Sequence, residues 1–275
     1  MRKVTTEVLA DGLTFPEGPR WRDGKLWFSD FYTYGVYSLS LEGVLERQLE
    51  VVNRPSGLGW TPDGKLLVVS MMDRKLLQWD GDTLTELADL SGLAAGHCND
   101  MLVCPDGTAF VGHFGYDLFG GEAFREASLI RVRPGAEPEL AADAMAFPNG
   151  AVLCDQGRTL VVAETFTKQL TAFNLGADAS LSERRVWADL GGRLPDGICL
   201  DAEGGIWVAA PGTGLIRVEG GGKISHELSL SQDCYACAIS DDGNSLLVCT
   251  SAHTAAADCE KYRSGRIERV DLKAL

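Results

Sequence analysis

Six short segments of the sequence place a polar or aromatic residue at the same point, directly before an apolar run. These residues are Glu17, Ser56, Asn99, Asn149, Asp196 and Tyr235. Four of them carry carboxylate or carboxamide oxygens. Asn and Asp beside glycine are also common turn formers, and the Asn149-Gly150 pair alone would fit a turn. Because four such donors recur at one equivalent position, we interpret them as a binding site.

The elements that must position these residues repeat along the chain. The turn glycines Gly24, Gly64, Gly107, Gly157, Gly204 and Gly243 are separated by 40, 43, 50, 47 and 39 residues. Each unit contains a hairpin of two apolar strands and continues into a third and often a fourth strand, and no stretch has an amphipathic helical pattern. This period predicts an all-β, six-bladed β-propeller that occupies residues 1–275 as a single domain.

A ring of blades must close, because its end blades would otherwise keep open strand edges. Residues 3–9 are strand-like and precede the first unit. We expect them to form the outermost strand of the sixth blade, beside residues 266–272. The longest insertion, residues 117–127 in the third unit, is interpreted either as a lid over the site or as a surface connection.

In a propeller the four oxygen-bearing residues would lie at one mouth of the central channel. Two carboxylates with two neutral amide oxygens, and no sulfur or imidazole, suit one hard divalent cation such as Ca²⁺. Magnesium, manganese, zinc and ferrous iron stay open as alternatives. Without a cation, Glu17 and Asp196 would repel each other, so a bound metal would remove that cost.

The chain is acidic, with 39 Asp and Glu against 25 Lys and Arg and a formal net charge of −14. This charge argues against a nucleic-acid partner and against an anionic membrane surface. We expect a small-molecule substrate and a monomer or weak homo-oligomer. Residues 1–9 lack an apolar core and no later run is long enough to cross a bilayer, so a cytoplasmic location is expected.

Eight cysteines are present, and four of them, Cys104, Cys154, Cys199 and Cys249, lie inside apolar strand-like runs. We interpret these thiols as reduced core residues. The Cys234-x-x-Cys237 pair lacks the helix of a redox motif and the second pair of a structural zinc site. Core packing is therefore the preferred reading of this pair.

Four motifs in order resemble those of the SMP-30/gluconolactonase (regucalcin-like) family: Phe15-Pro16-Glu17-Gly18-Pro19, Asn99-Asp100, Pro148-Asn149-Gly150 and Pro195-Asp196-Gly197. The resemblance covers essentially the whole chain. It implies a six-bladed propeller with one catalytic divalent metal held by Glu17, Asn99, Asn149 and Asp196, and it implies that Asp196 is also the catalytic base. The usual activity of such proteins is lactone hydrolysis, and phosphotriesterase-type relatives share the metal site.

Sugar-lactone members that are similar to this chain usually carry an arginine two residues before the third-blade asparagine, where this chain has His97. Residues His113 and Asp117 should also lie near the substrate, and either histidine could instead have a structural hydrogen-bonding role. Aromatic residues follow several second strands and would favour a less polar substrate than a sugar lactone. They are Phe31, Tyr32, Tyr34, Phe114, Tyr116 and Phe166.

The sequence therefore predicts a gluconolactonase-like hydrolase that opens a lactone. The metal would polarise the carbonyl group and Asp196 would act as general base, with direct nucleophilic attack by Asp196 as a variant. The alternatives are a phosphotriesterase-type hydrolase and a non-catalytic propeller that binds a small ligand, because the fold alone does not separate these functions. No G-x-S-x-G elbow, H-E-x-x-H motif or Rossmann fingerprint occurs.

Overall fold

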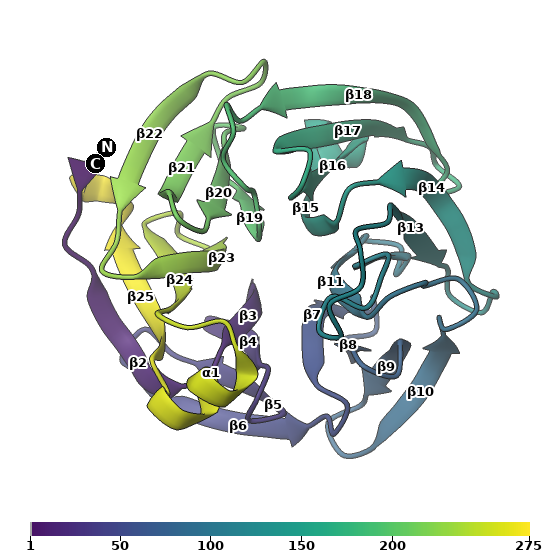
Figure 1. The fold of residues 1–275 in the computed structure, drawn as a ribbon, viewed down its shortest axis with the longest axis horizontal. Helices are drawn as coiled ribbons and strands as arrows, with labels where there is room; N and C mark the ends of the chain where they lie inside the picture. The colour runs from purple at the N-terminus through teal and green to yellow at the C-terminus, as the bar shows by residue number, and fades with distance from the viewer. Residues whose placement is uncertain (1) are drawn as a thin grey trace.

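In the computed structural model, which describes residues 2–275, six β-sheets are arranged as a ring around a central axis (Figure 1). Each sheet is a blade in which four strands pair antiparallel from the innermost strand outward, and the sheet of blade 5 has a fifth, parallel strand. The predicted all-β, six-bladed β-propeller is confirmed.

The strands of the six blades have the following bounds. Blade 1 contains β3 (Pro16–Arg22), β4 (Lys25–Asp30), β5 (Gly35–Leu39) and β6 (Leu45–Glu50). Blade 2 contains β7 (Pro55–Trp60), β8 (Leu66–Ser70), β9 (Lys75–Trp79) and β10 (Leu84–Asp89). Blade 3 contains β11 (Cys98–Val103), β12 (Ala109–His113), β13 (Ala127–Val132) and β14 (Glu139–Met145). Blade 4 contains β15 (Pro148–Cys154), β16 (Thr159–Glu164), β17 (Gln169–Leu175) and β18 (Leu181–Asp189). Blade 5 contains β19 (Ile198–Leu200), β20 (Ile206–Ala210), β21 (Gly214–Val218) and β22 (Ile224–Ser229). Blade 6 contains β23 (Asp233–Ile239), β24 (Ser245–Ser251), β25 (Gly265–Asp271) and β2 (Glu7–Leu13).

Acidic glycine turns form the hairpins between the first two strands of the blades. In blade 1, Asp23 and Gly24 both adopt positive φ angles, 50° and 74°. This conformation matches the twist of antiparallel strands, whereas in blades 2, 3 and 6 only the glycine of the Asp-Gly pair has a positive φ. In blade 2, the amide of Gly64 donates to the carbonyl of Thr61 at 2.9 Å and closes the corresponding turn.

The apolar core lies between the blades, not within one central volume. Within residues 2–275, each of the six interfaces between neighbouring blades holds its own cluster of buried aliphatic and small side chains. A seventh cluster is mostly aromatic and lies where the innermost strands begin; it is described below as the aromatic cluster. Inner strands such as β8 and β20 are buried on both faces, which explains their nearly continuous apolar sequences, whereas outermost strands such as β6 are mostly exposed.

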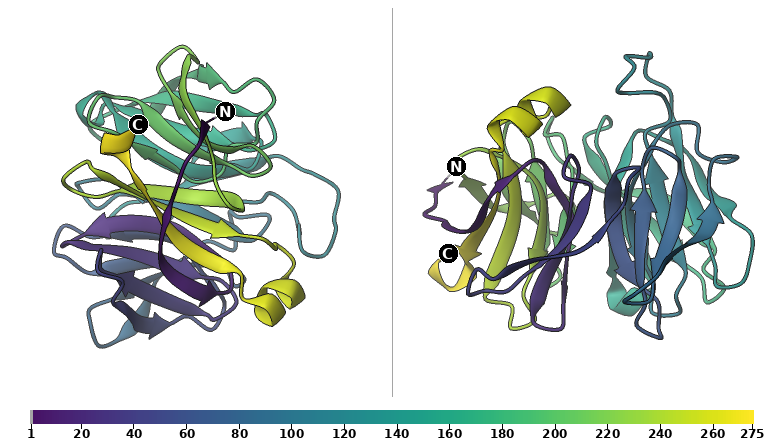
Figure 2. Two further views of the ribbon diagram at one scale, coloured as in Figure 1. Left: turned by 90° about the vertical axis from the view of Figure 1, so that its left-hand side faces the viewer. Right: turned by 90° about the horizontal axis from the view of Figure 1, so that it is seen from below.

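The N-terminal segment closes the ring, with bounds different from those predicted. Strand β2 pairs antiparallel with β25, so that Glu7 faces Arg269 and Leu13 faces Gly265. Figure 2 shows this purple strand running beside the yellow C-terminal strand. The predicted partner is confirmed, but the strand begins at Glu7 instead of Lys3. The preceding β1 (Arg2–Lys3) pairs parallel with β22 of blade 5 and adds a fifth strand there.

One short helix is present, although no stretch of the sequence has an amphipathic helical pattern. Helix α1 (Ala256–Tyr262) lies in the connection between β24 and β25. It has seven residues and buries only Cys259, so it is too short to show a helical period in the sequence. Two short 3₁₀ segments, η1 (Asp155–Gly157) and η2 (Leu272–Ala274), complete the elements. No helix within residues 2–275 is long and apolar enough to span a membrane.

All eight cysteines are free thiols, as predicted, and seven of them are buried. Residues Cys234 and Cys237 both lie in β23. The nearest thiol to Cys237 is that of Cys199 in blade 5, with the two Sγ atoms 3.4 Å apart. Burial raises the pKa of Cys234 and of Cys237, so both thiols stay protonated and pack as small apolar groups.

The long connection between β12 and β13 is anchored by His113, the last residue of β12. The imidazole is 2% exposed, with Nε2 2.8 Å from Oγ of Ser128 and Nδ1 3.0 Å from the amide nitrogen of Gly115. Burial lowers the pKa of His113 to about 4, so the ring is neutral at physiological pH. The connection itself projects from the same face of the ring as α1 (Figure 2, right). We call this side, where the innermost strands begin, the site face.

Removal of residues 1–13 should aggregate the protein or lower its melting temperature strongly. The truncation exposes the edge of β25 and removes the buried side chain of Leu13. Removal of residues 1–5, which leaves β2 intact, is the matched control. Thermal unfolding and size-exclusion chromatography check the prediction, and equal melting of the two truncations as monomers would show that β2 does not close the ring.

Buried neutral His113 should make the protein sensitive to acid. Its pKa rises from about 4 in the folded chain to about 6.5 on unfolding. The unfolded state therefore binds more protons between these values, and stability is lost as the pH falls from about 6.5 toward 4. The full shift corresponds to roughly 3 kcal/mol of unfolding free energy.

Urea unfolding of wild type and His113→Gln, both with chelator, measures this contribution. The gap in unfolding free energy between the two proteins should narrow as the pH is lowered through this window. A gap that stays constant from pH 7 to 4.5 would show that His113 does not titrate as described.

Candidate metal centre

Three of the four predicted ligand positions lie at the beginning of the innermost strands, not ahead of them as expected, and only the fourth precedes its strand. Glu17, Asn99 and Asn149 are each the second residue of their strand, in β3, β11 and β15. Asp196 precedes β19 by two residues. The strand pairing is irregular at the same point in blades 1, 3 and 4. Such bulges redirect side chains away from the regular alternation, here at the repeated position.

Close contact between neighbouring innermost strands fixes these positions. The residue after Asn149 is Gly150, and a Cβ atom there would lie 2.5 Å from the amide nitrogen of Ile198 in blade 5. A Cβ atom at Gly197 would lie 2.5 Å from Cβ of Ala236 in blade 6. No side chain fits between the strands at these points, so glycine is required by close approach. The side chains of Asn149 and Asp196, which precede these glycines, are therefore held by backbone that cannot shift independently of the neighbouring blade.

Two carboxylates are buried together near the axis. Glu17 is 8% exposed, and its pKa is raised well above the usual value, first by burial and next by the negative charge of Asp196. Asp196 retains some exposed surface, and burial is the main cause that raises its pKa to about 7; the charge of Asp100 raises it further. The two predicted acidic ligands therefore lie close enough to repel each other.

The side-chain amide of Asn149 connects the fourth and fifth blades. It donates a hydrogen bond to the carboxylate of Asp196, which partly offsets the rise in the Asp196 pKa. Its Nδ2 atom also lies 3.4 Å from Oγ1 of Thr165, and that hydroxyl donates to the carbonyl of Pro195 at 2.7 Å. Both bonds use the amide nitrogen, so the carbonyl oxygen of Asn149 is free to bind a cation. Asn99, at the equivalent position in blade 3, is also buried.

An ion pair that the sequence reasoning missed lies next to these residues. Arg20 in β3 donates from Nη2 to Oδ1 of Asp100 at 2.7 Å and to the carbonyl of Met101 at 2.5 Å. Asp100 occupies the position at which blades 1, 2, 4 and 5 carry glycine. The signal in the sequence was this exception, an acidic residue where the repeat requires a small one. The charge of Arg20 lowers the pKa of Glu17, but as the weakest of its contributions.

The three predicted substrate-contacting residues have different environments. His97 is half-buried, its Nδ1 atom has no hydrogen-bond partner, and burial lowers its pKa. Asp117 is half-exposed, with Oδ1 4.0 Å from Nδ1 of His97 and accepting from the amide of Gly120 at 2.8 Å. His113 is instead engaged by the backbone and hydroxyl contacts of its loop. The structure thus brings His97 and Asp117 together and places His113 beneath the loop surface.

Aromatic side chains surround the start of the innermost strands. Four of the six aromatic residues predicted for the channel mouth belong to the aromatic cluster: Phe31, Tyr32, Phe114 and Tyr116. Phe166 packs against the cluster member Phe147, with ring centroids 4.9 Å apart. The cluster also contains Phe15 and Tyr235, whose centroids are 4.6 Å apart across the junction of blades 1 and 6. Tyr34, the sixth, is not a member of this cluster.

Another residue that the sequence reasoning missed is Arg54, which precedes Ser56 in blade 2 by two positions. Its Nε and Nη1 atoms are buried without a hydrogen-bond partner. The guanidinium group lies over the ring of Tyr32, 4.7 Å from its centroid. Its position in the repeat is the same as that of His97, which precedes Asn99 by two residues.

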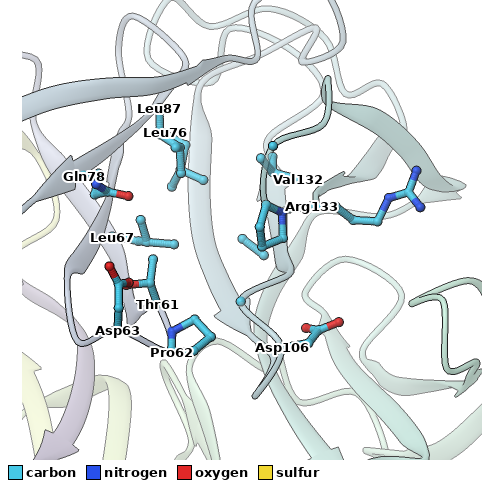
Figure 3. Close-up of a pocket in the computed structure, with 14 residues that line it drawn as sticks. Thr61, Pro62, Asp63, Leu67, Leu76, Gln78, Leu87, Asp106, Val132 and Arg133 are labelled. Carbon is cyan, nitrogen blue, oxygen red and sulfur yellow. The ribbon is translucent and has the colours of Figure 1, made fainter.

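A cleft away from the axis contains none of the predicted site residues. It measures about 390 Å³ and lies between blades 2 and 3 (Figure 3). Its floor is formed by Leu67, Leu76 and Val132, with Asp63 and Arg133 at its rim. The apolar floor continues the core of this blade interface, so the cleft is a shallow gap in blade packing and contributes nothing to the metal centre.

Comparisons with known proteins agree with this architecture. The solved structure of a gluconolactonase from Xanthomonas campestris is 22% identical, with a TM-score of 0.79 over 96% of this chain and 88% of that chain. A calcium-binding protein, regucalcin, from Agrobacterium tumefaciens is 24% identical, with a TM-score of 0.81 over 98% and 95% of the two chains. A luciferin-regenerating enzyme is 17% identical, with a TM-score of 0.82 over 97% and 95%. These likenesses show a shared fold.

The family model described as SMP-30/Gluconolactonase/LRE-like region matches residues 15–253. This range includes Glu17 and Asp196 and all six innermost strands. The chain therefore belongs to the SMP-30/gluconolactonase/LRE-like family.

Proposed function

We propose that this protein is a metal-dependent hydrolase that opens a lactone, and that the reaction takes place at Glu17, Asn99, Asn149 and Asp196. The observation that supports this most is the buried pair of Glu17 and Asp196, in which burial and mutual repulsion raise the pKa of Glu17. Family membership and the shared fold with a gluconolactonase support the reaction class.

The residues fit a divalent cation by their chemistry. Two buried carboxylates at short range are costly unless a positive charge lies between them. Asn149 has a free carbonyl oxygen, and the set as a whole offers oxygen ligands only. Such a set favours Ca²⁺, with water completing the coordination. Mg²⁺, Mn²⁺, Zn²⁺ and Fe²⁺ are the competitors in a metal panel.

A bound cation would polarise the lactone carbonyl and stabilise the negative charge that develops on its oxygen. The protein itself supplies the proton acceptor. A carboxylate oxygen of Asp196 would take the proton of the attacking water and return it to the ring oxygen as the acyl C–O bond breaks, and the amide of Asn149 would hold that carboxylate in position by its hydrogen bond. A neighbouring cation would lower the Asp196 pKa from about 7, so that the base is ionised at neutral pH.

The substrate would approach from the site face. Its ring would lie among the aromatic residues of the cluster, while His97 and Asp117 contact its polar groups. His113 would act beneath them by fixing the loop that carries Asp117. Apolar walls favour a lactone with fewer hydroxyl groups than a sugar lactone.

Replacement of Asp196 by Asn should lower metal-saturated turnover by roughly 10²–10⁴-fold, because it removes a positioned general base. Asn149→Asp is the matched comparison: it adds a negative charge and should tighten cation binding, without replacing the base. Lactone hydrolysis at saturating metal, with metal affinity measured by calorimetry, separates the two roles. Near wild-type turnover in Asp196→Asn would reduce Asp196 to a ligand.

Chelation should lower the melting temperature, and added Ca²⁺ should restore it. A cation that binds only the folded state stabilises it by mass action. Glu17→Gln, which removes one of the repelling carboxylates, should show a smaller difference between chelator and Ca²⁺. Differential scanning fluorimetry with each metal of the panel checks this. An identical melt with and without chelator, in protein shown to contain metal beforehand, would contradict the site.

A further inference from the structure

We propose that Arg54 selects the substrate by binding a carboxylate group that the lactone carries, so that the preferred substrate is an acidic lactone with an apolar body. This inference rests on the proposed lactone hydrolysis and names the substrate class of the same site. It is carried by the backbone, the stacking and the unpaired donors of Arg54.

The backbone holds Arg54 in an unusual conformation. Its φ angle is +69°, in the left-handed region that residues with a Cβ atom rarely adopt. Two backbone hydrogen bonds fix it there, from the amide of Arg54 to the carbonyl of Val51 at 3.0 Å and from the amide of Met71 to the carbonyl of Arg54 at 2.9 Å. Such strain is concentrated at functional sites, because the surrounding structure must maintain it.

Two aromatic rings hold the guanidinium group by its faces. The ring centroids of Tyr32, in blade 1, and of Phe119, in the loop after β12, lie 4.7 and 4.9 Å from its central carbon. Such contacts restrict the side chain of Arg54 without providing hydrogen-bond acceptors for its N–H donors. Arg54 is therefore oriented before any substrate binds.

Two donors of the guanidinium group are unsatisfied. Nε and Nη1 of Arg54 are buried and have no acceptor within residues 2–275. Other buried arginines of the chain are paired: Arg217 contacts Asp201, and Arg20 contacts Asp100. A chain with 39 acidic and 25 basic residues has ample acceptors, so two buried and unpaired nitrogens on the half-buried Arg54 are unexpected unless a ligand supplies the oxygens.

A carboxylate matches this arrangement best. Its two oxygens accept two parallel N–H bonds, which arginine offers from Nη2 together with either Nε or Nη1. His97, whose charge environment includes Arg54, contributes a second unpartnered nitrogen, Nδ1, at the equivalent position of the next blade. The surrounding rings of Tyr32, Phe114 and Phe119 offer no further hydrogen-bonding partners for a polyhydroxylated body except the Tyr32 hydroxyl.

Electrostatics point the same way. The protein carries a net charge of −14, so an anionic substrate would be repelled from most of its surface. A divalent cation would neutralise Glu17 and Asp196, and Arg54 would then leave the mouth locally positive. Arg54 would thus attract an acidic substrate to the site face, whereas the rest of the surface would repel it.

The test compares two lactones that differ only in the acidic group. The first is γ-butyrolactone with a carboxylate on the carbon next to the ring oxygen, and the second is the same ring with a methyl group on that carbon. Wild type should prefer the acid in kcat/KM. Arg54→Met, which preserves the stacked volume, should reduce the ratio of the two kcat/KM values by at least about tenfold. Arg54→Lys keeps the positive charge but lacks the planar group with two parallel N–H donors, and it should give an intermediate ratio.

A control and a stability readout separate selection from folding. Arg22 stacks over Trp60 at 4.9 Å at the far end of β3, so Arg22→Met should leave the ratio unchanged. Arg54→Met should melt at the same temperature as wild type or higher, because it removes an unpaired buried charge. A wild type without preference for the acid, or an unchanged ratio in Arg54→Met, would overturn the inference while lactone hydrolysis stands.

If wild type hydrolyses neither lactone nor any other lactone with any metal of the panel, the proposed function fails, and binding then tests Arg54 directly. Calorimetry would compare cyclopentanecarboxylate with cyclopentanol on the Ca²⁺-loaded protein. Carboxylate binding that is lost in Arg54→Met but retained in Arg22→Met would uphold the anion site. Equal binding by wild type and Arg54→Met, or no binding by wild type, would overturn it.

Discussion

The contact between neighbouring innermost strands is the constraint on which the rest of the structure depends. At Gly150 and Gly197 the strands approach so closely that a Cβ atom would overlap the next blade. The residues just before them, Asn149 and Asp196, are therefore directed by the whole ring rather than by their own blades. Closure of that ring by β2 then becomes a condition for the site as well as for stability.

This geometry explains why Glu17 and Asp196 remain close despite their like charges. Relaxation would require the innermost strands to separate, and their packing around the axis prevents it. The nearby cation of Arg20 does little to relieve the repulsion, because it is committed to Asp100 and the backbone next to it. The fold thus maintains a local electrostatic cost that a bound cation would offset. Rigid packing, rather than any single side chain, would thus create the affinity for such a cation.

The sequence predicts the propeller well because each blade reuses one hairpin with its turn glycine. It also predicts where the ligand candidates lie, since equivalent positions of a repeat meet at one end of the axis. It misses α1, whose seven residues are too few to show a period. It also misses Arg54, whose importance comes from its positive φ angle and from rings 22 and 65 residues away in the chain. Spacing within the repeat does not reveal such contacts.

The innermost strands carry different groups at their two ends. At the site face they present Glu17 and Asp196, and unpaired Arg54 lies at the same end. At the far end Leu153 and Leu200 border a cavity of about 310 Å³ that Arg20 and Asp241 also line. The apolar side chains between the blades supply the burial that offsets charged groups left unsatisfied at the site face. Unpaired charges of both signs at one end leave the protein less stable than its packing allows. Such a loss of stability is expected at a site whose charges would be paired only when a cation and an anionic ligand bind.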